Sequence, residues 1–216
     1  KQFKLADGTS MPTLDEYLTQ GEKFPETVLV VEFKKHSDLN QENTLVDLTL
    51  KKLREHGLYD PSRVMFISFS MNMCERLAKL APEFTNQYLN GDIAPAELHR
   101  KGINGIDYHY NVIYKHPEWV TEAHDLGMSV NVWTVNKEQD IRAMIGFGVD
   151  CITTNDPLLV RRLLGMEELR NNPPATEDPL ADPKAVVVAG NARFTMLGDR
   201  LVRMTASSRT GPHWEL

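Results

Sequence analysis

The feature that most constrains the fold is a repeated alternation of short apolar runs with segments of helical spacing. Six such runs, rich in β-branched and aromatic residues, lie between turn residues in the first three quarters of the chain. They are Val28–Phe33, Val64–Phe69, Asn86–Leu89, Gly105–Tyr108, Ser129–Trp133 and Val149–Thr153. Successive runs begin roughly 20–36 residues apart, the period of a βα unit. The pattern predicts a parallel sheet with crossover helices.

The segments between these runs carry helix signals, for example Leu45, Leu48 and Leu53 before Gly57, a residue type favoured just past a helix end. Helices are predicted over Thr13–Leu18, Asn43–Glu55, Met71–Leu80, Pro95–Arg100, Pro117–Leu126, Lys137–Gly146 and Pro157–Leu164.

Two α/β architectures fit this alternation, an open doubly wound sheet and a (β/α)₈ TIM barrel. A closed barrel needs eight units and about 250 residues. The 216-residue chain offers six units and opens on a helix without its strand. We therefore expect an incomplete (β/α)₈ barrel of about six βα units over residues 1–166, and a chain whose N-terminus is cut.

The last quarter of the chain has a different pattern of residues. Four prolines within residues 171–183 predict a linker over 167–184. The runs Ala185–Ala189, Arg193–Met196 and Leu201–Met204 then predict the start of an antiparallel β-rich module over 185–216.

Composition excludes several function classes. The net charge of -6 is not the excess of positive charge that is typical of nucleic-acid-binding proteins. No apolar run reaches the ~18–20 residues of a membrane-spanning helix. Cys74 and Cys151 are too few for a disulfide framework and too isolated for a zinc site. The first residues lack the apolar core of a signal peptide.

The most informative candidate site follows the first apolar run. Glu32 and Lys34 are two residues apart and share one face of the predicted strand. A carboxylate and an ammonium ending an apolar strand are costly unless they are paired or bind a ligand. Active sites of barrels form at the carboxyl ends of the strands, which makes the pair a candidate for a functional role. From the spacing alone, a simple Glu–Lys ion pair is an equally good interpretation.

Other strand ends supply further candidates. Asn131 and Trp133 share a face, and Trp133 suits either a pocket mouth or the core. In the stretch 107–110, His109 is a candidate acid, base or ligand, although a lone histidine is more often structural. The segments 68–70 and 153–156 close two further strands.

Together these stretches resemble the glycerophosphodiester phosphodiesterases. The matching motifs are Met11–Leu18, Val31–Lys34, Ile67–Phe69, Asn131–Asn136 and Gly148–Pro157. Their order and spacing fit over roughly Leu5–Leu164, and the stretch Asp107–Val135 is similar to a branch common in Bacteroides-type bacteria.

The resemblance implies a TIM barrel that hydrolyses glycerophosphodiesters, small molecules of lipid metabolism, to an alcohol and glycerol 3-phosphate with Ca²⁺ or Mg²⁺. It places a metal-ligating carboxylate on Glu32 and a catalytic, phosphate-facing lysine on Lys34. The glycerol-side pocket would be lined by Phe69, Trp133, Tyr108 and His109. A periplasmic or extracellular location is also implied.

The sequence departs from this family at its start. The family's His-Arg pair, Glu-x-Asp metal motif and second histidine do not precede Lys4, so the general acid and base histidines are missing. We therefore expect the parent protein to be the enzyme and this chain alone to be inactive. A non-catalytic barrel acting as a binding module and a phosphoinositide-type phospholipase are the alternatives.

The tail carries a second resemblance. Residues 189–204 are similar to the opening β-module of α-glucosidase-type glycoside hydrolases. This implies a gene fusion of two hydrolases, with a plain β-extension as the alternative.

Overall fold

The computed structural model describes residues 10–165 and the strands at 186–189, 192–198 and 201–206. Residues 10–165 hold a six-stranded sheet in which each strand is parallel to the next. Its strands are β1 (Leu29–Phe33), β2 (Val64–Ser68), β3 (Thr85–Tyr88), β4 (Gly105–His109), β5 (Ser129–Trp133) and β6 (Cys151–Ile152).

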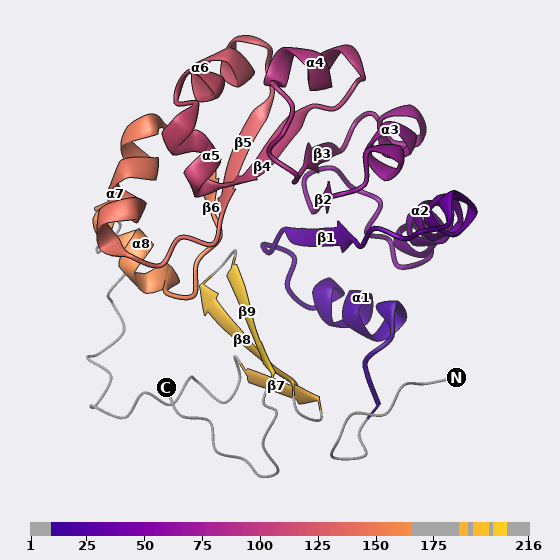
Figure 1. Cartoon of the computed structure of the whole chain (residues 1–216). Helices are drawn as coiled ribbons and strands as arrows, with labels where there is room; N and C mark the ends of the chain where they lie inside the picture. The colour runs from indigo at the N-terminus through magenta and orange to yellow at the C-terminus, as the bar shows by residue number, and fades with distance from the viewer. Residues whose placement is uncertain (1–9, 166–185, 190–191, 199–200, 207–216) are drawn as a thin grey trace, which may run out of the picture.

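The order of the strands decides between the two expected architectures. Strands β1 to β6 lie side by side in their sequence order, with no reversal among the described strands. A doubly wound sheet reverses its order at a switch point, whereas a (β/α)₈ barrel does not. Figure 1 shows the helices around the outside of the curved sheet. The predicted incomplete barrel is confirmed.

Eight helices are described in residues 10–165. They are α1 (Leu14–Glu22), α2 (Leu39–Glu55), α3 (Met71–Leu80), α4 (Pro95–Arg100), α5 (Tyr110–Lys115), α6 (Glu118–Asp125), α7 (Glu138–Phe147) and α8 (Pro157–Leu163). Seven of them correspond to predicted helices, and α5 was not predicted. Its first turn is capped by the side chain of His109, which accepts a hydrogen bond from the amide of Asn111.

The core lies between the sheet and its helices in two apolar clusters. In α2, Val46, Leu50 and Leu53 recur at helical spacing and are all buried. They belong to the same cluster as Leu29 and Phe33 of β1. These contacts identify the face of β1 that carries Leu29 and Phe33 as the outer, helix-facing side of the sheet.

A polar contact joins α1 to α2. The His56 ring lies 2.5 Å from Glu22 Oε1 through Nδ1 and 3.0 Å from Asp15 Oδ1 through Nε2. Hydrogen bonds to Asp15 and then to Glu22 raise the pKa of His56 above its ordinary value of 6.5. The contacts of the His56 ring with both carboxylates therefore help to hold α1 against the end of α2.

Strands β7 (Val186–Ala189), β8 (Ala192–Gly198) and β9 (Leu201–Ala206) form a separate antiparallel sheet. They coincide with the three runs expected there, while the expected linker at 167–184 lies outside the described residues.

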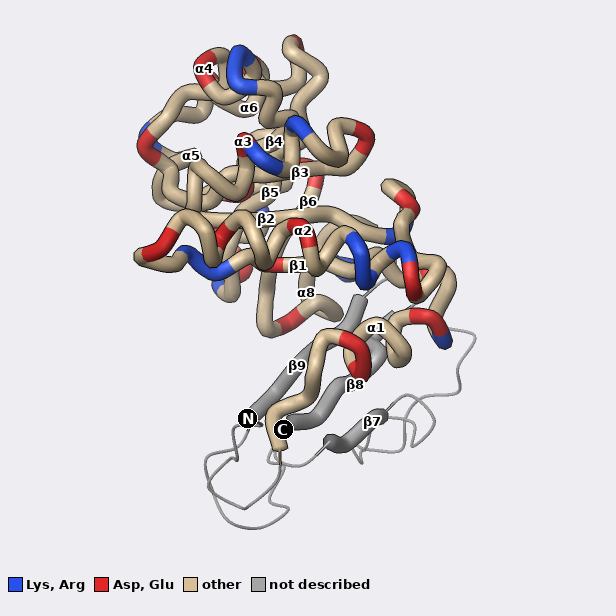
Figure 2. The backbone as a smooth tube through the Cα atoms, turned by 90° about the vertical axis from the view of Figure 1, so that its right-hand side faces the viewer, with Lys and Arg blue, Asp and Glu red and all other residues tan. Residues whose placement is uncertain are grey.

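Surface properties of the described residues agree with the composition. Figure 2 shows acidic and basic positions interspersed along residues 10–165. None of the described helices combines the length and apolar character needed to span a bilayer. Cys74 and Cys151 are both free thiols.

Candidate functional site

The pair Glu32–Lys34 lies at the carboxyl end of β1. Glu32 is on the strand face opposite Leu29 and Phe33, and it therefore points to the inner side of the curved sheet. Val30, on this same inner face, is 46% exposed, so the face is more open than an apolar buried strand would be. Lys34 Nζ lies 2.5 Å from Glu32 Oε1, and its side chain is 75% exposed against 29% for Glu32. The two residues thus pair with each other and remain open to solvent.

Three aromatic side chains come together at the carboxyl ends of three strands. Phe69 follows β2, His109 ends β4 and Trp133 ends β5. The ring centroids of Phe69 and Trp133 are 5.9 Å apart, and those of His109 and Trp133 are 5.1 Å apart. We call these residues the aromatic cluster. It unites three of the four residues expected in the glycerol-side pocket.

Tyr108 does not share this position. Adjacent residues of a strand point to opposite faces, so Tyr108 lies on the outer face when His109 lies on the inner one. It is 0% exposed, packs against Tyr88 and Trp119, and its hydroxyl donates to the Ile93 carbonyl at 2.7 Å. This placement makes Tyr108 a core residue and removes it from the set of pocket-lining candidates.

The inner side of the sheet also holds buried polar groups. Gln87 donates from Nε2 to Ser129 Oγ at 2.9 Å and accepts from Asn131 Nδ2 at 2.9 Å. The chain of bonds passes from β3 to β5 over Gly105 of the intervening strand β4. A Cβ at Gly105 would lie 2.6 Å from both Gln87 Cγ and Ser129 Oγ, so only glycine leaves room for these bonds.

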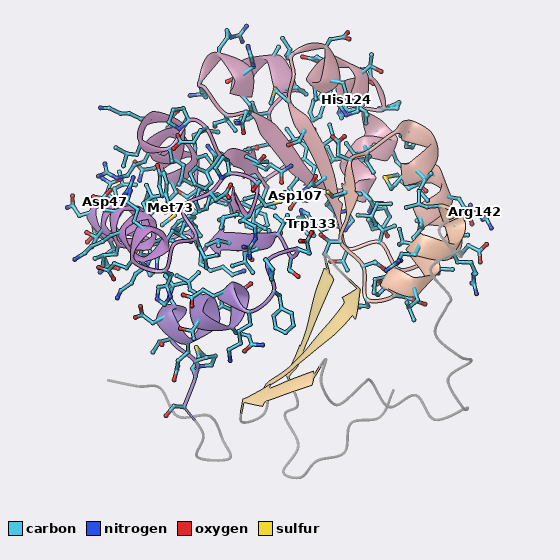
Figure 3. All side chains as sticks on the ribbon, turned by 180° about the vertical axis from the view of Figure 1, so that it is seen from behind. Asp47, Met73, Asp107, His124, Trp133 and Arg142 are labelled. Atoms are coloured by element: carbon cyan, nitrogen blue, oxygen red, sulfur yellow. The ribbon has the colours of Figure 1, made fainter. Side chains whose placement is uncertain are left out.

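Asp107 is the residue of this site that the sequence reasoning passed over. It is 3% exposed, and its Oδ1 has no hydrogen-bond partner among the described residues. Burial, with a smaller contribution from the negative charge of Glu32, raises the pKa of Asp107 to about 7. Trp133 Nε1 donates to the backbone carbonyl of Asp107 at 2.9 Å, and Figure 3 shows the two residues together. Asp107, whose carboxyl group is buried, is therefore joined through its backbone to Trp133 of the aromatic cluster.

The capacity of this site for a metal rests on two carboxylates. Within the part of the chain that the structure describes, no group of three His, Cys, Asp or Glu side chains could hold an ion by itself. The negative charge of Glu32 acts on Asp107, and Asp107 Oδ1 has no partner among the described residues. Hard cations take oxygen ligands, and Mg²⁺ is often held by one or two carboxylates together with substrate phosphate and water.

The remaining strand-end candidates have structural partners. Ser68 donates its hydroxyl to the Phe33 carbonyl at 2.8 Å, and Ser70 donates to Glu42 Oε2 at 2.7 Å. Thr154 donates to Asn136, and Asp156 caps α8. Of these hydroxyls, only that of Ser70 donates to a base, the Glu42 carboxylate, and both residues are buried.

Comparison with known proteins places this site in context. Residues 1–159 match the sequence profile described as the glycerophosphoryl diester phosphodiesterase family. A crystal structure of a glycerophosphodiester phosphodiesterase from Parabacteroides distasonis is 35% identical, with a TM-score of 0.72 over 78% of this chain and 70% of that one. No curated protein matches the chain.

More distant structures share the fold. An Oleispira antarctica phosphodiesterase in complex with the product sn-glycerol-3-phosphate is 18% identical, with a TM-score of 0.60 over 72% of this chain and 62% of that one. A glycerophosphodiester phosphodiesterase from Agrobacterium tumefaciens is 20% identical, with a TM-score of 0.54 over 72% of this chain and 63% of that one. The chain thus spans less than two thirds of the length of these two proteins.

Proposed function

Because the chain belongs to the glycerophosphoryl diester phosphodiesterase family, we propose that its strand ends form the cation- and substrate-binding part of such an enzyme. The reaction is hydrolysis of a glycerophosphodiester to an alcohol and glycerol 3-phosphate. The observation that carries the proposal is the gathering of the Glu32–Lys34 pair, Asp107 and the aromatic cluster at the carboxyl ends of barrel strands. The product bound to the Oleispira phosphodiesterase supports this substrate class.

Lys34 would hold the phosphoryl group. Its ammonium is exposed and, within the part of the chain that the structure describes, pairs only with Glu32; an exposed ion pair contributes no more than about 1 kcal/mol. Lys34 can therefore exchange Glu32 for a phosphoryl oxygen at little cost. Its charge would then stabilise the negative charge that develops on the phosphoryl oxygens.

Glu32 and Asp107 would hold the divalent cation, Ca²⁺ or Mg²⁺. The fit rests on Asp107, since a buried carboxylate with an unpartnered oxygen is costly and a bound cation would relieve that cost. The cation would polarise a phosphoryl oxygen of the substrate. Phe69 and Trp133 of the aromatic cluster would pack against the glycerol carbons and exclude water from one side of the phosphodiester.

The proton transfers need a general acid and a general base, and residues 10–165 place no pair of histidines at this site: Asp107 and His109 are the residues there that could exchange a proton. We propose that the family's two histidines act from a segment outside this chain and that the chain alone binds the product without turning over substrate. We further propose a role in bacterial lipid metabolism and a periplasmic or extracellular location. A fusion to a glycoside hydrolase stays a prediction.

Calorimetric titration of the 216-residue chain with sn-glycerol 3-phosphate in Ca²⁺ or Mg²⁺ tests the proposal. We expect Lys34→Ala to weaken binding about tenfold or more, the value of a charge-assisted hydrogen bond. The exposed neighbour Lys35 supplies the matched control, because Lys35→Ala removes the same charge one residue away. Equal affinity of wild type and Lys34→Ala would contradict the role of Lys34.

Turnover assays separate the alternatives. The chain and the complete gene product are each offered a glycerophosphodiester and a phosphoinositide. Robust hydrolysis by the chain alone, abolished by Glu32→Ala, would refute the missing-histidine argument. Binding without hydrolysis by the complete gene product would favour a binding module, and preference for the phosphoinositide would favour a phospholipase.

A further inference from the structure

A second buried carboxylate, outside the site described above, holds the two loops that carry Lys34 and Phe69. Glu42 lies in the first turn of α2 and is 1% exposed. Its Oε1 accepts the backbone N–H of His36 at 3.0 Å, and its Oε2 accepts the hydroxyl of Ser70 at 2.7 Å and the amide of Asn72 at 3.0 Å. Two donors from two different loops, and a third from the first turn of α3, therefore converge on one side chain.

The first loop connects β1 to α2 and contains Lys34. His36, anchored by Glu42, is two residues after Lys34. Phe33, one residue before Lys34, is anchored as well, because its carbonyl accepts the hydroxyl of Ser68 at 2.8 Å. Lys34 and Lys35 thus lie between two fixed points of the backbone. The lysine side chain is exposed, but the backbone from which it projects is held on both sides.

The second loop connects β2 to α3 and contains Phe69 of the aromatic cluster. Ser68 Oγ accepts the N–H of Ser70 at 3.0 Å, so the two serines fix the backbone on either side of Phe69. Ser70 then donates its hydroxyl to Glu42. One continuous set of hydrogen bonds therefore runs from Phe33 through Ser68, Ser70 and Glu42 to His36.

The charge of Glu42 is maintained by these contacts. Burial alone would raise the pKa of Glu42, but the hydrogen bonds from Ser70, His36 and Asn72 together hold it below its ordinary value. A buried carboxylate is a costly way to fix a loop unless every acceptor is used, and here both oxygens are used.

We propose that Glu42 is a positioning residue, which sets the distance and direction between the phosphate-binding Lys34 and the aromatic cluster at Phe69. The inference rests on the proposed function, since it assumes that Lys34 binds the phosphoryl group. Glu42 acts through the two loops and touches neither the substrate nor the cation.

The test is a double-mutant cycle on the affinity of the 216-residue chain for sn-glycerol 3-phosphate in Ca²⁺. Glu42→Gln keeps the size of the side chain but replaces one carboxylate oxygen by an amide nitrogen, which cannot accept, so the bonds to one of the two loops are lost in either orientation of the amide. We expect Glu42→Gln to weaken binding about 3–10-fold in the wild-type chain and less than about twofold when Lys34→Ala is already present. A residue that acted only on global stability would not show this dependence on Lys34.

A matched control lies on the same helix. Asp47 also joins α2 to α3, through Arg76 at 2.6 Å, but it touches neither loop. Figure 3 shows Asp47 at the outer edge of the molecule, far from Asp107 and Trp133. Asp47→Asn should leave the affinity unchanged. Ser70→Ala supplies a second variant, which removes one donor to Glu42 and should weaken binding about 2–5-fold with the same dependence on Lys34.

The outcomes separate the two proposals. If Lys34→Ala weakens binding but Glu42→Gln has no effect, or an equal effect in both backgrounds, the positioning role is overturned and the proposed function stands. If Lys34→Ala has no effect in the wild-type chain, the role of Lys34 fails and the positioning role fails with it. Loss of folding in both Glu42→Gln and Ser70→Ala would assign Glu42 to stability and also overturn the inference.

Discussion

Gly105→Ala tests whether the polar groups on the inner side of the sheet are as closely packed as the structure requires. The added Cβ would lie 2.6 Å from Gln87 Cγ, 2.6 Å from Ser129 Oγ and 3.1 Å from the Ser129 carbonyl oxygen. One of these neighbours is backbone, so a side-chain rotation alone cannot make room. The bond from Gln87 to Ser129 crosses this point and must lengthen or break.

Three contributions set the expected change in the free energy of unfolding of Gly105→Ala. Overpacking costs about 1–3 kcal/mol, and loss of a neutral hydrogen bond adds about 0.5–1.5 kcal/mol. Replacing glycine reduces the entropy of the unfolded chain and returns about 0.4–1 kcal/mol. We expect a net loss of about 0.5–4 kcal/mol in the free energy of unfolding, centred near about 2 kcal/mol. With a urea dependence of about 2 kcal/mol per molar, the midpoint falls by roughly 1 M.

Urea unfolding followed by circular dichroism measures this loss. The control is Gly146→Ala in α7, where an added Cβ meets nothing within 4 Å. Alanine is the better helix former by about 0.5–1 kcal/mol, so this variant should be more stable than the wild type. A change smaller than about 0.5 kcal/mol in Gly105→Ala, with the control behaving as expected, would refute the close packing of Gln87 and Ser129 around β4.

Three further predictions follow from single contacts. The pKa of His56 is raised in the folded state, so its contribution to stability is complete below about pH 6.5 and is lost as the pH rises through the folded-state pKa. Urea unfolding of wild type and His56→Gln should therefore show a stability difference that is largest at acidic pH and shrinks as the pH becomes alkaline. Terbium(III) bound near Asp107 should luminesce when Trp133 is excited. In a luminescence titration, Asp107→Asn should weaken the affinity of the chain for terbium(III) about fivefold or more. An unchanged titration curve would remove Asp107 from the cation site. Gly148 ends α7 at φ 81°, and a Cβ added there would meet no atom within 4 Å. Gly148→Ala should therefore lower the free energy of unfolding by about 1–2 kcal/mol through backbone strain alone. An unchanged stability in thermal unfolding would contradict this backbone conformation.

Most of the barrel could be predicted from the sequence because its signals are local. Apolar runs of strand type repeat at βα spacing, and glycines mark several helix ends. The boundaries shifted where tertiary contacts decide them. The run Val149–Thr153 contributes only Cys151–Ile152 as strand, because only these residues pair in register with β5. Helix α5 escaped prediction because it has six residues, several of them aromatic or β-branched, which read locally as a continuing strand.

The candidate site was partly readable from the alternation of strand residues. In β1, Glu32 shares a strand face with Lys34, and this alternation predicts it as a site residue. In β4, the same alternation places Gly105, Asp107 and His109 on the inner face and Tyr108 on the outer one. Tyr108 was assigned to the pocket by resemblance, and its position in the core follows from the alternation. Glu42 carried no local signal, because its role depends on hydrogen bonds with His36 and with Ser70, which is 28 positions away in the sequence.

The inner side of the sheet shows why polar residues at equivalent positions differ in function. Gln87, Ser129 and Asn131 satisfy one another by hydrogen bonds, so their burial is already compensated and they need no ligand. Asp107 also lies on the inner face and is 3% exposed, yet one of its oxygens has no partner among the described residues. The sequence alone predicts polarity at all four positions but cannot say which of them is left unsatisfied. The oxygen of Asn86 is also without a partner among the described residues, but it belongs to a neutral amide. Asp107 is the unsatisfied group that can carry a charge, so it is the one whose cost a cation would remove.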